Sequence, residues 1–308
     1  MILEYNSLPE TLVLLSISLL IIIIGMLLNG FIVIINLFWW IKRQTLQAKD
    51  VLITSLGLVR LIHLFVYMEL MIFIISDFYV FQIYKLEYRE TVIIFIDFCS
   101  LWWGSVLSVF YGVKITNYSS RLFIRLKMNI SKLAPWMLLI SMVISFLSSL
   151  PYRWVLFSNR NINGTDCGKR TMEINVKLFI IIFAGSIIPF LIVCVSISLI
   201  ILSLLRHTRN MSSRNSSFND AQKDIHIGVI RCMILFLVFY TLHLVVYIYS
   251  PLVSFLRTYG FNFITVTFMC AYPSLHSISI IYCNKELRKS FLVVFSCARL
   301  GNFKQETP

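Results

Sequence analysis

The chain has 308 residues, of which 58% are hydrophobic and only 13% are charged, and its formal net charge is +13. A soluble globular domain carries roughly 25% charged residues, so this composition excludes a soluble protein and indicates one membrane-embedded unit over residues 1–308. The positive charge does not indicate nucleic-acid binding, because the cations occupy short loops between apolar runs instead of one basic face. We therefore expect an integral membrane protein surrounded by the lipid bilayer.

The N-terminal apolar run is expected to stay in the protein as its first span. Glu4 and Glu10 precede the run and no Lys or Arg does, whereas a cleavable signal peptide begins with a positively charged region. The run is also too long for the apolar core of a signal peptide.

Seven apolar stretches are long enough to cross a bilayer as helices. A hydrocarbon core about 30 Å thick requires roughly 20 apolar residues in a helix. The sequence therefore predicts an all-α membrane protein, a seven-transmembrane helix bundle with a short eighth helix in the tail at 283–308. The predicted spans are Leu12–Trp40, Val51–Ile75, Val92–Ile115, Leu133–Tyr152, Val176–Leu205, Ile227–Ser250 and Phe261–Tyr282.

The distribution of Lys and Arg predicts which side each loop faces. With the N-terminus outside, seventeen of the 27 Lys and Arg residues fall in the inner loops and tail and eight in the outer segments, as the positive-inside rule requires. Of five N-x-S/T sequons, only that of Asn163 then lies in an outer loop, where glycosylation can reach it. The other four sequons are at Asn117, Asn129, Asn210 and Asn215. A glycan on one of them would contradict this topology.

Arg60 lies well inside the second predicted span. A central arginine costs at least about 2.5–3.5 kcal/mol on insertion scales, so we expect it to face the bundle interior and to have partners. The polar groups expected at similar depth are Asn29 in the first span and His276 and Ser277 in the seventh. We interpret these residues as a structural polar core. An ion or proton relay is the alternative, but the sequence shows no carboxylate at the same depth.

A second polar and aromatic group is expected nearer the outer surface. It comprises Glu69, Asp97, Trp102 and Trp103, and such a combination suits a cavity for a small, mostly apolar molecule. Ordinary helix packing with interfacial tryptophans explains the same pattern equally well.

Motifs for catalysis, metal binding and cofactor binding are missing from the sequence. There is no HExxH, GxSxG or Walker loop, and the five histidines do not have metal-ligand spacing. The seven cysteines form no CxxC pair, so they indicate neither a zinc site nor a disulfide framework. We therefore expect that the protein is not an enzyme and that it binds no cofactor. Internal repeats, which a transporter commonly carries, are also lacking.

Several motifs, taken in order along the chain, resemble those of the type 2 (bitter) taste receptors. The first span contains G-x-x-x-N-x-F-I from Gly25 to Ile32, followed by W-x-K-R-x-x-L from Trp40. DVLITSLGLVR ends at Arg60, and LSVFY-x-x-KI-x-N-x-S runs from Leu107. The later motifs are SLLRHTRNM at 203–211, H-x-x-x-x-R at 226–231, FL-x-x-Y at 236–240, YPSLHS at 272–277 and N-K-E-L-R at 284–288.

This resemblance implies a plasma-membrane receptor that binds small bitter molecules and activates a heterotrimeric G protein of the gustducin or inhibitory type. Trp102 matches the family's pocket tryptophan, and Asn163 its glycosylated outer loop. The candidate ligand-binding residues are Glu69, Asp97, Cys99, Trp102, Trp103, Val106, His243, Tyr247, Val266 and Met269. The candidate switch and coupling residues are Phe110, Tyr111, Lys114, Arg206, His207, Arg231, Tyr240, His276 and Ser277.

The chain departs from the family pattern at several positions. Asp97–Phe98 replaces the usual Asn-His, so a carboxylate at the pocket mouth could favour cationic ligands. His243 replaces a common tyrosine and could make the response depend on pH. We expect no disulfide between Cys99 and Cys167, since Cys99 lies too deep, and we regard Cys297 as a candidate for palmitoylation.

Two alternatives stay open at this stage. A vomeronasal type 1-like chemosensory receptor would share the seven spans, but it fits the seventh-span motif less fully and lacks the motifs of the first and fifth spans. A transporter or channel would be expected to show duplicated halves and carboxylates at the midplane.

Overall fold

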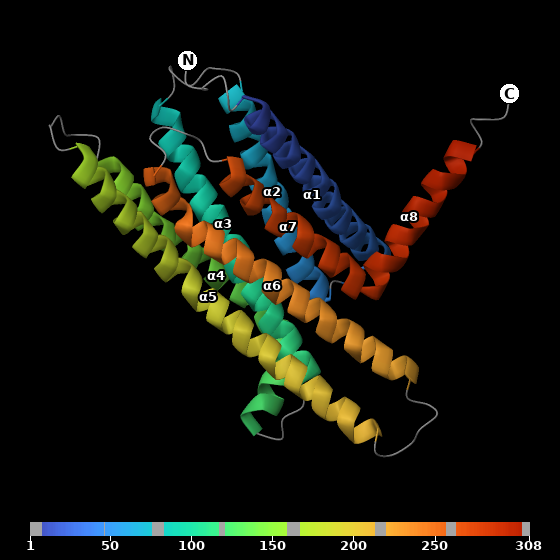
Figure 1. The fold of residues 1–308 in the computed structure, drawn as a ribbon. Helices are drawn as coiled ribbons and strands as arrows, with labels where there is room; N and C mark the ends of the chain where they lie inside the picture. Colours follow the sequence, from blue (N-terminus) through green and yellow to red (C-terminus); the bar gives the residue numbers. More distant parts are fainter. Residues whose placement is uncertain are drawn as a thin grey trace.

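The computed structural model describes residues 8–45, 47–75, 83–116, 121–158, 167–212, 220–256 and 263–303. Within these ranges the regular structure is entirely helical (Figure 1). Helices alone satisfy every backbone N–H and C=O within one segment, which is what hydrocarbon surroundings demand. The helices are α1 (Leu8–Arg43), α2 (Ala48–Ile75), α3 (Ile83–Ile115), α4 (Arg121–Ser158), α5 (Cys167–Ser212), α6 (Asp220–Leu256), α7 (Phe263–Cys283) and α8 (Lys285–Phe303).

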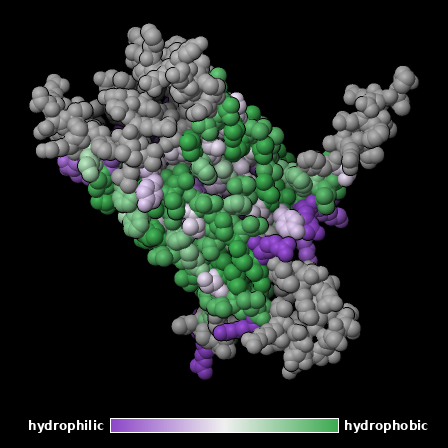
Figure 2. Space-filling model, viewed as in Figure 1, coloured by the Kyte–Doolittle hydropathy of each residue, from purple (hydrophilic) through white to green (hydrophobic). Residues whose placement is uncertain are grey.

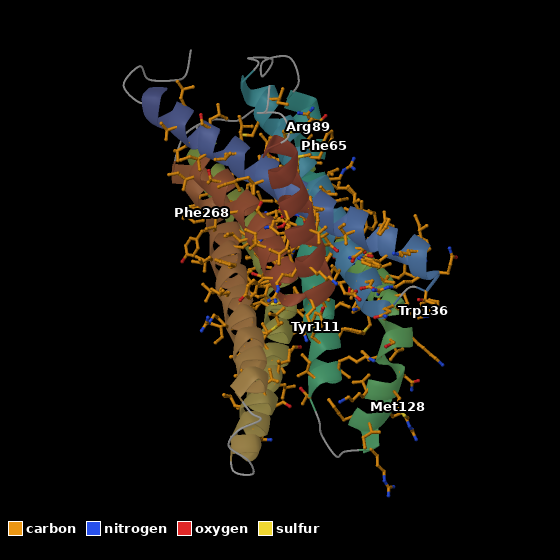
Figure 3. The ribbon with its side chains drawn as sticks, turned by 90° about the vertical axis from the view of Figure 1, so that its right-hand side faces the viewer. Phe65, Arg89, Tyr111, Met128, Trp136 and Phe268 are labelled. Carbon is orange, nitrogen blue, oxygen red and sulfur yellow. The ribbon has the colours of Figure 1, made fainter. Side chains whose placement is uncertain are left out.

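Seven of these helices, α1 to α7, are long and apolar enough to cross a membrane, which confirms the predicted number of spans. Figure 2 shows a broad hydrophobic band on the visible face, with hydrophilic residues towards its ends. The lipid-facing side chains include Trp136 of α4 and Phe268 of α7, 63% and 47% exposed, which point outward on opposite sides of the bundle (Figure 3). Apolar surface of this extent requires a bilayer around it.

Several helices extend well beyond the apolar stretches that predict them. α4 begins at Arg121, twelve residues before the predicted Leu133, and α5 continues to Ser212 instead of Leu205. Hydropathy detects only the part of a helix that lies in hydrocarbon. The basic turns beyond that part stay helical because their residues can face water without breaking the backbone hydrogen bonds.

The third helix occupies the centre of the bundle. In its apolar window, 72% of the residues are buried, against 28% for α1, α4, α5 and α6, and it contacts α2, α4 and α5. A side chain on α3 therefore faces another helix in almost every direction. The interior contains two apolar clusters, one that includes Tyr67, Phe98 and Tyr247, and another that includes Leu52, Phe110 and Leu138.

The short helix α8 confirms the predicted eighth helix, and it leaves the end of α7 beside the end of α1 (Figure 1). Asn284 caps it, because its Oδ1 accepts hydrogen bonds from the backbone N–H of Glu286 at 3.0 Å and of Leu287 at 3.4 Å. Arg43 of α1 donates to Glu286 at 2.8 Å, and Lys49 of α2 lies 3.6 Å from the same carboxylate. The beginning of α8 is thus attached to both α1 and α2.

Substitution of Glu286 by glutamine should weaken this attachment in a pH-dependent way. The hydrogen bond from Arg43 holds the pKa of the Glu286 carboxyl below its ordinary value of 4.5, so the pair stabilises the fold above that value and is lost as the pH falls through the lowered pKa. The pair is about one third exposed, so we expect a loss below about 1 kcal/mol at pH 7. Thermal unfolding of purified wild type and variant at pH 7 and pH 4 should show a larger difference at pH 7 than at pH 4.

Candidate functional site

Arg60 lies at the centre of the buried polar core, with no exposed surface. Its Nη2 contacts His276 Nδ1 and lies 3.4 Å from the Tyr272 hydroxyl, while the guanidinium carbon is 5.2 Å from the centroid of the Tyr272 ring. The expected contact between Arg60 and the seventh span is therefore present. A guanidinium can only donate, so His276 accepts through Nδ1 and carries its ring proton on Nε2.

Asn29 joins the first and seventh helices at a neighbouring position. The Ser277 hydroxyl lies 2.7 Å from Asn29 Oδ1, and Asn29 Nδ2 donates to the Gly25 carbonyl at 2.8 Å. All these groups are buried, and unsatisfied polar atoms in hydrocarbon cost several kcal/mol. The bonds therefore fix the register of α1 on α7, whereas the described contacts of Arg60 are with His276 and Tyr272.

Asp97 faces the second helix inside the bundle, not an exposed pocket mouth as the sequence suggests. Its side chain is 1% exposed, and its Oδ1 lies 2.9 Å from Nε2 of the equally buried His63. The two groups are not aligned for a hydrogen bond, so the contact is electrostatic. Asp97 also interacts electrostatically with His243 and Tyr247 of α6. We call His63, Asp97, His243 and Tyr247 the Asp97 cluster.

The Asp97 cluster is joined to the Arg60 contact by stacked rings. His243 stacks on Tyr247 with centroids 5.7 Å apart and on Tyr272 with centroids 4.6 Å apart. The ring centroids of Tyr272 and His276 are 5.8 Å apart, and those of His276 and Phe236 are 4.1 Å apart. Tyr240 is fully buried against Phe190, Phe236 and Tyr272. These rings form a continuous path between α6 and α7.

The predicted ligand-binding residues of α3 fall into two groups that face different helices. Trp102 packs against the apolar cluster that contains Tyr247, Val266 and Met269, and its buried indole N–H has no hydrogen-bond partner among the described residues. Trp103 instead donates to the Leu138 carbonyl of α4 at 3.2 Å. Cys99 and Val106, one turn on either side of Trp103, pack in the same α4-facing cluster.

Three predicted ligand-binding residues, Cys99, Trp103 and Val106, are therefore placed in helix packing against α4 and not beside Asp97. Glu69 is exposed on α2 and is not brought to the cluster either. Cys99 is a free, buried thiol, and the side chain of Cys167 lies outside the described residues.

The predicted coupling residues at the end of α3 lie toward the end of the bundle that carries α8, whereas Tyr240, His276 and Ser277 belong to the buried ring path and polar core. Phe110 is buried with its ring 5.9 Å from that of Tyr111, and the exposed Lys114 lies 5.9 Å from the Phe110 centroid. Arg206 and Arg231 are exposed on α5 and α6. The side chains of His207 and Cys297, and the whole of Asn163, lie outside the described residues.

A cavity of about 150 Å³ opens at this end between α3, α6 and α7. We call it the α8-end cavity. Tyr111 lies on its α3 wall (Figure 3), and His276, the partner of Arg60, lies on its α7 wall. The remaining lining residues are Gly104, Leu107, Ser108, Ile115, Met233, Phe236, Ser279, Ile280, Cys283 and Asn284.

Sequence reasoning missed His63 and Tyr272. His63 follows Arg60 by three residues, so both project from one face of α2, and this spacing was the available indication. Tyr272 begins the YPSLHS motif four residues before His276, which places both rings on one face of α7.

Seven membrane-spanning helices, a buried polar centre and a cavity at the α8 end define the protein as a seven-helix receptor of the G-protein-coupled class. Comparison with known proteins is more specific, because residues 8–299 match the family described as Taste receptor protein (TAS2R). The chain belongs to this family of type 2 taste receptors. It is thus a bitter taste receptor and a multi-pass protein of the cell membrane.

Individual relatives agree with the family match. Human taste receptor type 2 member 39 is 32% identical over 283 residues, which cover 87% of this chain and 82% of the relative. The macaque (Macaca mulatta) protein of the same name is 31% identical over 281 residues, covering 87% and 81%. Taste receptor type 2 member 4 of Pongo pygmaeus is 29% identical over 278 residues, covering 86% and 90%. The match decides against the vomeronasal and transporter alternatives.

Proposed function

We propose that this receptor binds small bitter compounds beside Trp102 and the Asp97 cluster, and that it activates a G protein of the gustducin or inhibitory type through the α8-end cavity. The N-terminus would then face outward and α8 the cytoplasm. Aromatic walls with a few polar atoms are typical of small-molecule sites. The basic residues Lys114, Arg206 and Arg231 line the side where a G protein would dock.

The observation that supports this proposal most directly is the ring path from Tyr247 through His243 and Tyr272 to His276. His243 belongs to the Asp97 cluster, and His276 both holds Arg60 and lines the α8-end cavity. A ligand that changes the position of Tyr247 or His243 would change the packing of Tyr272, and with it the contact between Arg60 and His276.

Agonist binding can shift the receptor only if it favours one packing of these rings over another. Moving a two-state equilibrium from 1:99 to 99:1 requires a difference of about 5.5 kcal/mol in affinity for the two states. Aromatic contacts of about 0.5–1.5 kcal/mol each, together with a hydrogen bond to a charged group of about 1.5–3 kcal/mol, are of the size that such a difference requires.

Calcium release in cells that express the receptor with a gustducin-type chimeric G protein tests this function. Among bitter compounds that activate the wild type, the response should be lost in Trp102→Ala, which removes a wall of the ligand site, and in Lys114→Ala, which alters the coupling end. Trp136→Ala and Lys132→Ala are matched controls, since Trp136 and Lys132 are exposed on α4. Surface labelling of every variant separates loss of function from loss of expression.

The same cells show which outcome would contradict the proposal. A response to agonist in the controls but not in the two test variants supports the proposed ligand and coupling sites. A full response of Trp102→Ala or of Lys114→Ala at the surface level of the wild type would contradict the ligand site or the coupling site, respectively.

A further inference from the structure

We propose that the carboxylate of Asp97 anchors a protonated amine of the agonist, and that the ammonium group takes the position which the His63 imidazole now holds. This inference rests on the proposed function, because it names the class of ligand for the same site. It is argued from the bonding of Asp97, from the rings around it and from the placement of the neighbouring charges.

The bonding of Asp97 is incomplete. Its side chain is 1% exposed, and neither carboxylate oxygen accepts a hydrogen bond from the described residues. His63 approaches at 2.9 Å without the alignment of a hydrogen bond, and neither of its ring nitrogens has another partner there. Buried carboxylates are normally both paired and hydrogen-bonded. Asp97 therefore retains the capacity to accept strong bonds from a charged donor.

The groups around Asp97 suit a cation. The ring centroids of Tyr67 and His63 are 4.8 Å apart. Those of Tyr247 and Phe98, the residue that follows Asp97, are 6.2 Å apart. Aromatic rings attract ammonium groups through their π faces. The Tyr247 hydroxyl and His243 Nδ1 are buried without a hydrogen-bond partner among the described residues, so they can bind further polar atoms of the same ligand.

The one fully buried guanidinium nearby, that of Arg60, does not satisfy Asp97. Among the described residues no ion pair joins the two side chains, and Arg60 is held instead against His276 and Tyr272 of α7. His63 follows Arg60 by three residues on α2, so the two side chains project from the same face of the helix. The carboxylate thus remains available to a cation that displaces the His63 ring.

Displacement of His63 would also connect the amine to the receptor's switch. His63 lies about one helical turn from Arg60, so an ammonium that moves the His63 ring alters the packing of α2 beside the Arg60 contact. An amine would gain a charge-assisted hydrogen bond that a neutral analogue of the same shape cannot make.

A panel of bitter primary and secondary amines, each paired with its uncharged N-acetyl derivative, tests this in the calcium assay. We expect the amines to be the more potent member of each active pair and Asp97→Asn to raise their half-maximal concentration roughly 10- to 100-fold. The receptor's potency for neutral agonists should change much less in Asp97→Asn than its potency for the amines. The asparagine is the residue that the family usually carries, so this variant is expected to fold.

A tethered amine tests the same inference without any known agonist. His63→Lys places an ammonium group on α2 next to Asp97, and we expect it to raise agonist-independent signalling. The neutral variant His63→Met, of similar length, should not do so, and Asp97→Asn should abolish the increase in the double variant. Surface labelling confirms that the compared variants reach the membrane in equal amounts.

The outcomes separate this inference from the proposed function. If neutral compounds activate the receptor and Asp97→Asn changes no potency, amine anchoring is overturned while the receptor function stands. If the panel is silent and His63→Lys signals no more than His63→Met, amine anchoring is overturned as well. If the panel is silent but His63→Lys signals through Asp97, the inference holds.

Discussion

Replacing His276 with phenylalanine is expected to destabilise the receptor more than replacing Arg60 and His276 together. Phenylalanine keeps a ring beside Phe236 but removes the nitrogen that accepts from Arg60. The fully buried guanidinium is then left with the Tyr272 hydroxyl at 3.4 Å. Leaving a buried charged donor without its acceptor costs about 1–3 kcal/mol or more, whereas replacing both groups by apolar ones of similar shape can be nearly neutral.

Thermal unfolding of the purified receptor measures this difference. We expect His276→Phe to unfold at a clearly lower temperature than wild type, and the double variant Arg60→Met with His276→Phe to recover most of the loss. Ile278→Ala is the control on the same helix, since Ile278 is 48% exposed to lipid. A double variant as unstable as His276→Phe alone would show that the buried charge is not the cause.

The number of spans and the polar centre were predictable because each follows from a large local free-energy cost. Apolar runs are costly to expose to water, and a charged side chain is costly to place in hydrocarbon without partners. An apolar run of about 20 residues has few stable alternatives to a membrane helix, and seven such runs are present. Arg60 requires buried partners wherever it lies in hydrocarbon. The sequence offers few polar residues at its depth, and His276 is one of them. The contact between Asn29 and Ser277 follows from the same shortage of polar groups.

The facing of side chains on α3 was not predictable from the sequence. A helix that is apolar on every side is buried on every side and gives no indication of its rotation about its own axis. Trp102 and Trp103 are adjacent, yet Trp102 packs near Tyr247 while Trp103 bonds to α4. The sequence predicts how deep in the membrane both tryptophans lie. Only the contacts with other helices show that their side chains point in different directions.

Asp97 illustrates how partner choice limits sequence-based prediction. The sequence indicates a carboxylate near the outer surface, and it presents His63 as one of five scattered histidines. Only the packing of α2 on α3 brings the two within 2.9 Å. The effect of having Asp97 in place of the family's usual asparagine therefore depends on His63, a residue of another helix.

The second large effect is expected at Gly25, where α1 packs tightly against Leu64 of α2 and Ser274 of α7. A Cβ at this position would overlap Ser274 and lie 2.8 Å from the nearest methyl carbon of Leu64. Ser274 is fixed there by hydrogen bonds to the Ile21 and Cys270 carbonyls. Gly25→Ala must therefore displace the Ser274 and Leu64 side chains, and overpacking of this kind typically costs about 1–3 kcal/mol in a packed interior. It would also strain the Asn29 contact with Ser277.

Gly30 provides the matched control, because it lies on the same helix and a Cβ there would meet no atom within 4 Å. Alanine stabilises a helix interior by about 1 kcal/mol relative to glycine, so Gly30→Ala should leave the unfolding temperature unchanged or raise it. Gly25→Ala should lower both the unfolding temperature and the amount of receptor at the cell surface. Adding Ser274→Ala removes the overlapping hydroxyl and should restore part of the loss. Equal behaviour of the two alanine variants would mean that propensity, and not the contact of α1 with α2 and α7, decides the stability at Gly25.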